Sequence, residues 1–195
     1  MNSAIGLRGS AADDITACWH RAAISLNLRV WPGAAGNATR IAQIQPDASF
    51  IEAFALEALG QRQHALPAFL HGALNHPRAA KMLLGIRVQK GPSGYHEIGD
   101  HNSGVSLQWN LHAYLRKPPR GAKDFFRAVL NDPRVEQLLS EVTETVHQWQ
   151  ENRTDDQTAY RRMMLMHSRR FAEAEADRLC DLGEGPNQGE SRRGS

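Results

Sequence analysis

Phe69-Leu-His-Gly-Ala-Leu-Asn-His-Pro77-Arg-Ala-Ala-Lys-Met-Leu-Leu84 recurs 56 positions later as Phe125-Phe-Arg-Ala-Val-Leu-Asn-Asp-Pro133-Arg-Val-Glu-Gln-Leu-Leu-Ser140. We refer to residues 69–84 as copy one and to residues 125–140 as copy two. Six positions are identical: Phe69/Phe125, Leu74/Leu130, Asn75/Asn131, Pro77/Pro133, Arg78/Arg134 and Leu83/Leu139. Several others exchange one apolar residue for another, as expected for a shared backbone with different neighbours. The duplication therefore indicates a repeated structural unit and not a catalytic motif.

Each copy has the pattern of a helix, a stop and a second helix. In copy one the apolar residues from Leu66 to Leu74 recur with the period of an α-helix. Pro77 and Pro133 end the first helix, because proline disfavours helical backbone in the preceding residue and is tolerated in the first turn of the next helix. Copy two then continues as an amphipathic helix, whose expected apolar face consists of Val135, Leu138, Leu139, Val142, Val146 and Trp149.

Apolar periodicity and turn residues predict further helices. We expect these over residues 15–31, 49–60, 62–74, 107–115 and 158–182. Residues 33–38 are predicted to form a connection and residues 85–104 an irregular segment, because both are rich in glycine. No run alternates β-branched with polar residues, so strands are not predicted. The prediction is an all-α stack of antiparallel helical hairpins in one domain over residues 1–182, with a disordered tail over 183–195.

The composition is ordinary for a globular protein, and several classes of protein do not fit it. The 195 residues are 41% hydrophobic and 23% charged. No stretch approaches the roughly 20 consecutive apolar residues that span a bilayer, and the first residues lack an export signal. We therefore expect a cytoplasmic protein with no membrane partner. Cys18 and Cys180 have no metal-binding or disulfide-framework spacing, so we predict no metal and no cofactor.

The small net charge of +2 hides an uneven distribution along the chain. Residues 61–134 hold eleven Lys/Arg and four acidic residues, whereas residues 135–182 hold six and ten. A basic half of this kind steers anionic partners, although solvated helix faces give the same count. The candidate basic binding surface consists of Arg78, Lys81, Arg87, Lys90, Arg116, Lys117 and Arg120.

Two arginine pairs near the C-terminus favour a second class of partner. Residues 161–162 and 169–170 are eight positions apart, which would place them on nearly one face of a single helix. With the basic region 78–134, they could hold a phosphate backbone, so the alternative function is a nucleic-acid-binding accessory protein. Acidic residues flank both pairs, and intrahelical ion pairs on a solvated helix explain the same pattern.

The only concentration of possible catalytic or metal-binding groups is His96-Glu97-Ile-Gly-Asp100-His101-Asn102. His96, Asp100 and His101 could ligate a metal or act as acid and base in a metal-assisted reaction. The two histidines are five residues apart, however, and not the four that place a pair on one helix face. In the alternative interpretation, Asp100 or Asn102 caps the following helix. We therefore expect that the protein is not an enzyme.

Gly60, Ala65, Phe69 and Pro77 have spacings of five, four and eight, which is similar to the tetratricopeptide pattern. Residues 49–115 also contain the His76-Pro-Arg-Ala-Ala-Lys-Met-Leu-Leu-Gly85 segment, a following Pro/Gly-rich loop, Gly99-Asp100 and a closing helix with Tyr114. In these features the chain resembles the tetratricopeptide-like proteins related to suppressor of tumorigenicity. The chain departs from that family at His76, Ala80, Met82 and His101-Asn102. The resemblance implies stacked helical hairpins and brings no catalytic residues.

Together, the repeat, the charge and the resemblance predict a function in binding. Stacked hairpins bury their apolar faces against one another and leave a concave surface. We expect a non-catalytic scaffold that binds a protein or peptide, and the basic region favours an acidic partner.

Overall fold

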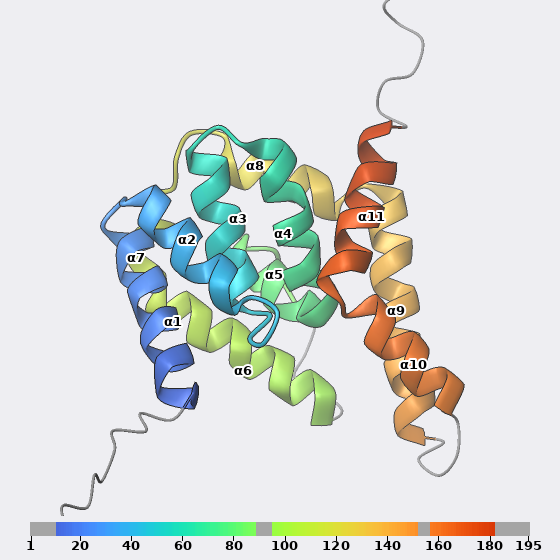
Figure 1. Cartoon of the computed structure of the whole chain (residues 1–195). Helices are drawn as coiled ribbons and strands as arrows, with labels where there is room; N and C mark the ends of the chain where they lie inside the picture. Colours follow the sequence, from blue (N-terminus) through green and yellow to red (C-terminus); the bar gives the residue numbers. More distant parts are fainter. Residues whose placement is uncertain (1–10, 89–94, 152–156, 182–195) are drawn as a thin grey trace, which may run out of the picture.

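The computed structural model describes residues 11–88, 95–151 and 157–181, and every regular element in these ranges is an α-helix (Figure 1). The prediction of an all-α chain is confirmed for this part of the sequence. Within it, no helix combines the length and the apolar character needed to cross a membrane. The helices are α1 Ala11–Asn27, α2 Trp31–Ile41, α3 Ala48–Ala58, α4 Arg62–Asn75, α5 Pro77–Leu83, α6 Tyr95–Asn110, α7 His112–Arg116, α8 Ala122–Leu130, α9 Pro133–Glu151, α10 Gln157–Met166 and α11 Arg169–Asp181.

Both copies of the repeat have the predicted structure of a helix, a stop and a second helix. Copy one comprises the end of α4 and all of α5, and copy two comprises the end of α8 and the start of α9. Pro77 and Pro133 are the first helical residues of α5 and α9, where the missing amide hydrogen costs nothing. In α9, Val135, Val142 and Val146 are buried as expected, whereas Trp149 is 37% exposed and lies against Tyr160.

The helices pack around a continuous apolar core that includes residues from Cys18 to Ala176. Helices α1 to α4 pack consecutively, α5 packs on α6, and α11 returns to pack on α4 (Figure 1). Aromatic rings lie at the centre of this core. The ring centroids of Phe69 and Phe126 are 4.6 Å apart, and that of Phe54 lies 5.3 Å from Phe126 and 5.1 Å from Tyr114. Both copies of the repeat thus contribute to one core.

The prediction that residues 33–38 form a connection is wrong, because they lie inside α2. Pro32 occupies the first turn of this helix, where proline is favoured. Ala34, Ala35 and Ala38 are buried, and alanine is the strongest helix former. Small side chains allow α2 to pack closely on α1 and α3, so the Gly/Ala composition indicated close packing and not a loop.

The irregular segment predicted for residues 85–104 is also wrong over its second half, which belongs to α6. Gly104 explains part of the misleading signal. A Cβ atom at Gly104 would lie 2.6 Å from Sδ of Met82 and 3.1 Å from Cα of Ala79. The glycine therefore permits close packing of α6 on α5 and does not mark a turn. Residues 89–94 lie outside the described residues.

The single helix predicted over residues 158–182 is two helices, α10 and α11, which are separated at His167 and Ser168. The Ser168 hydroxyl donates to the Leu165 carbonyl oxygen at 2.7 Å and accepts from the Phe171 amide at 3.2 Å. Ser168 thereby caps the start of α11, as serine favours at helix N-termini. The predicted tail over residues 183–195 lies outside the described part of the chain.

Candidate functional site

A groove lies between the second helices of the two copies, α5 and α9. Its volume is about 540 Å³. Copy one supplies residues from α5 and the segment that follows it, and copy two supplies residues from the α8–α9 joint and from α9. The lining residues are Pro77, Lys81, Ile86, Arg87, Leu130, Asn131, Glu136, Leu139, Ser140 and Thr143.

The groove combines an apolar base with a positively charged rim. Leu130 and Leu139 are each 7% exposed and belong to the base. Lys81 and Arg87 are exposed at the rim, and neither makes an ion pair with another residue in the described ranges. Glu136 is the single carboxylate among the lining residues. The groove therefore has an excess of positive charge beside an apolar surface.

Arg127 of copy two holds the end of α5 in place. Its guanidinium group donates to the Leu84 carbonyl oxygen, from Nη2 at 2.8 Å and from Nε at 3.2 Å. This carbonyl lies at the C-terminal end of α5, where helices have unpaired acceptors and favour cations. Gly85 follows with φ of +70°, a conformation that favours glycine and ends the helix. The contact joins the two copies beside the groove.

The other residues of the predicted basic surface do not lie together. The Arg78 side chain is only 13% exposed and forms an ion pair with Glu97 at 3.6 Å, so it is not a surface cation. Lys90 lies outside the described residues. Arg116, Lys117 and Arg120 are exposed around the α7–α8 connection, beside Arg29, whose Nη2 donates to the Lys117 carbonyl oxygen at 2.9 Å. Among the described residues of the predicted surface, Lys81 and Arg87 line the groove and the others do not.

Asp100 has a structural role that differs from the predicted one. It lies in α6 with 5% exposure, and its carboxylate accepts hydrogen bonds from the amides of Arg78 at 2.7 Å and Ala79 at 2.8 Å. It therefore caps α5, the preceding helix in the sequence, and not the following one. His101 lies half-buried on α6, and the His96 side chain is outside the described residues. In the part of the chain that the structure describes, no three His, Cys, Asp or Glu residues form a metal-binding group.

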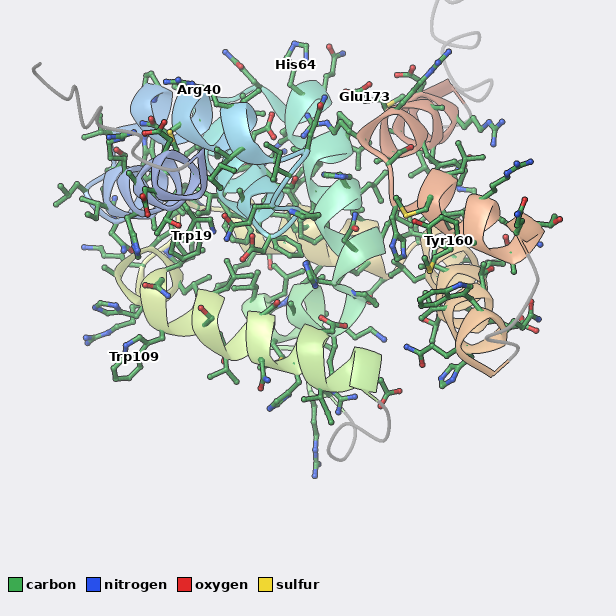
Figure 2. The ribbon with its side chains drawn as sticks, turned by 60° about the horizontal axis from the view of Figure 1, so that its bottom comes forward. Trp19, Arg40, His64, Trp109, Tyr160 and Glu173 are labelled. Atoms are coloured by element: carbon green, nitrogen blue, oxygen red, sulfur yellow. The ribbon has the colours of Figure 1, made fainter. Side chains whose placement is uncertain are left out.

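A second, larger groove has the opposite charge and lies between α4 and α11, with a volume of about 720 Å³. Its wall contains Glu52, Glu173 and Asp177, with Arg169 as the only Lys or Arg. Arg169 lies 2.7 and 3.1 Å from the two carboxylate oxygens of Glu52, which is buried. Figure 2 shows His64 of α4 and Glu173 of α11 on the same side of the molecule.

This ion pair corrects the prediction that residues 161–162 and 169–170 present one basic face. The two arginine pairs are on separate helices, and Arg169 points inward to Glu52. The predicted phosphate-binding face is therefore not formed. Nothing in the sequence indicated the pairing of Glu52 with Arg169, because the two residues are 117 positions apart.

A buried pair of polar side chains lies between α3 and α4, near Arg169. Ser49 Oγ is 2.7 Å from His71 Nδ1, and both residues are buried. Burial, with the nearby Arg169 charge as a second cause, lowers the pKa of His71 to about 4, so the imidazole is neutral at pH 7. A serine beside a histidine is a possible nucleophile and base. Here neither residue lines the described grooves, and the pair contributes to packing.

No protein-family model matches the chain, and neither a curated protein nor a solved structure shows significant similarity to it. The resemblance to tetratricopeptide-like proteins stays a prediction.

Proposed function

We propose that this protein is a non-catalytic scaffold that binds an acidic, partly apolar segment of another protein in the groove between α5 and α9. The observation that carries the proposal is the pairing of an apolar base with Lys81 and Arg87, two exposed cations that form no ion pair in the described structure. An apolar side chain of the partner would contact Leu130 and Leu139, and a carboxylate would lie near the cations. Charge of this kind contributes to specificity and to the rate of association.

Charge favours this groove over the larger one. The groove between α4 and α11 has a carboxylate-rich wall, and its arginine is already paired with Glu52 and Glu173. An acidic segment would be repelled there, because like charges across an interface are costly. The groove between the two copies has the complementary charge and is the better site for the partner that we propose.

The proposed scaffold is a stack of antiparallel helical hairpins with tetratricopeptide-like geometry. Support comes from the short connections between α1 and α2 and between α3 and α4, and from the packing of each of these helices on the next. The repeated unit also supports it, since duplication of a helical unit is how such scaffolds are built. Binding surfaces in such stacks lie on the concave side, between neighbouring units.

A fluorescent peptide that alternates glutamate with leucine tests the proposal, with a lysine–leucine peptide of equal length as the control probe. Anisotropy titrations should show binding of the acidic peptide alone, weakening as salt increases. Lys81→Glu combined with Arg87→Glu should abolish binding. Arg161→Glu with Arg162→Glu makes the same charge change on exposed α10 and should leave binding unchanged. Failure of the acidic peptide to bind, or equal loss in both variants, would contradict the proposed function.

A further inference from the structure

A second surface of the molecule combines exposed apolar side chains with positive charge and lies away from both grooves. It is formed where the C-terminal end of α1 meets the junction of α6 and α7. The side-chain Nδ2 of Asn27 donates to the Asn110 backbone carbonyl oxygen at 2.7 Å. The side-chain Oδ1 of Asn27 accepts from the Tyr114 backbone amide at 3.1 Å. These bonds fix the α1–α2 turn against the α6–α7 junction. We call this region the α1–α6 end, defined by residues 24–30, 105–112 and 116–120.

The apolar side chains at the α1–α6 end are unusually exposed. Trp109 is 81% exposed, and Figure 2 shows it projecting from the end of α6. Leu28 is 70% exposed and Val30 53% exposed on the adjoining α1–α2 turn. Ile24 lies one helical turn before Leu28, and it too is exposed. Exposed apolar side chains that gather in one region mark an interaction site.

The charge of this end is entirely positive. Residues 15–46 and 101–123 contain seven Lys/Arg side chains and no acidic one. Arg29, Arg116, Lys117 and Arg120 are exposed among them. Four cations therefore adjoin the apolar side chains, with no acidic residue in the sequence segments that form the surface.

Arg29 is the cation at the α1–α2 turn and has an unusual backbone conformation. Its φ is +63°, in the left-handed region where a helix usually ends in glycine. Arginine costs stability there relative to glycine, because its Cβ is crowded. The chain nevertheless has arginine, whose side chain bonds to the Lys117 carbonyl oxygen and adds to the cluster of cations.

We propose that the α1–α6 end docks on the surface of an anionic lipid bilayer. Tryptophan prefers the interface between lipid headgroups and acyl chains, and Lys/Arg clusters are attracted to anionic headgroups. Leu28 and Val30 favour lipid over nucleic acid, since aliphatic side chains do not stack on bases as aromatic ones do. The described grooves, where a peptide would bind, do not include these residues. The docking is peripheral and needs no spanning helix.

Sedimentation with vesicles of phosphatidylcholine, with or without phosphatidylglycerol, tests the proposal on the full chain. Binding is expected only to the anionic vesicles, and high salt should weaken it. Arg116→Glu with Lys117→Glu should weaken binding at least about twentyfold, because each cation near an anionic surface contributes roughly fivefold. Trp109→Ala should weaken it several-fold without unfolding the protein, since the side chain is so exposed.

Control variants test whether vesicle binding depends on the α1–α6 end or on basic residues elsewhere. Arg161→Glu with Arg162→Glu changes the charge equally and should bind vesicles normally. Lys81→Glu with Arg87→Glu should also bind normally, so failure of the groove proposal leaves this test unaffected. Arg29→Gly should weaken binding while leaving the fold intact, because glycine suits the backbone there. Absence of vesicle binding, equal loss in the α10 variant, or binding of RNA in place of vesicles would overturn the proposal.

Discussion

Copy one and copy two share a local structure but differ in what surrounds them. Helix α4 of copy one packs on α3, α9 and α11, whereas α8 of copy two packs chiefly on α3 and α9. At the first position of the repeat, Phe69 is fully buried, but Phe125 is half-buried at the surface under the Arg62 guanidinium group. Identical residues therefore form the same helical joint, while their contribution to stability depends on the helices that cover them.

The largest expected difference between the copies is at this phenylalanine. Phe69→Ala removes a ring that packs on Phe50 and Phe126, and we expect a loss of about 4 kcal/mol in the free energy of unfolding. Phe125→Ala should cost only about 1 kcal/mol, because the ring is already partly in water. Urea denaturation of both variants measures the difference. Equal losses of stability would contradict the conclusion that Phe69 is packed in the core and Phe125 is partly solvated.

The next difference is at the position that is His71 in copy one and Arg127 in copy two. Burial lowers the pKa of His71 from 6.5 to about 4, so the folded state binds fewer protons than the unfolded state between these pH values. Stability is therefore complete above pH 6.5 and decreases towards pH 4, by up to about 3 kcal/mol. The His71→Gln variant should lose this component of the pH dependence, as urea titrations over the range would show. An unchanged pH profile would be inconsistent with a neutral, buried His71.

A smaller difference concerns how the second helix of each copy is capped. Asp100→Ala leaves the amides of Arg78 and Ala79 without their acceptor in a buried position, and we expect a loss of about 2 kcal/mol. Asp132→Ala removes the bond to the Arg134 amide and the ion pair with the Arg134 guanidinium group, both at an exposed joint, with an expected loss of about 1 kcal/mol. Thermal unfolding of the two variants compares them. A larger loss in the Asp132 variant would contradict the role of α6 in capping α5.

The fold can be predicted from the sequence where the determining interactions are local. The joints at Pro77 and Pro133 follow from the backbone of one residue and its neighbour, and both are confirmed. Helix α2 and the first part of α6 could not be predicted in this way, because glycine and alanine also permit close helix packing, which depends on partners distant in the sequence. The cap by Asp100 and the pair of Glu52 with Arg169 were missed for the same reason.

The candidate site, too, could be predicted only in part from the sequence. Positive charge in the central region was evident from the sequence, and Lys81 and Arg87 do lie together on one groove. Nothing in the sequence indicated that Arg78 is withdrawn into an ion pair, or that Arg116, Lys117 and Arg120 lie beside Arg29 at another end. The positions of charges follow from periodicity, whereas their grouping on a surface follows from the tertiary fold.

Hydrogen exchange of the protein with and without the acidic glutamate–leucine peptide tests most directly whether the groove between the two copies is the binding site. We expect slower exchange in α5 and the first half of α9, and unchanged exchange in α11, which borders the acidic groove. Protection confined to α4 and α11, with none in α5 or α9, would contradict a binding site formed jointly by the two copies.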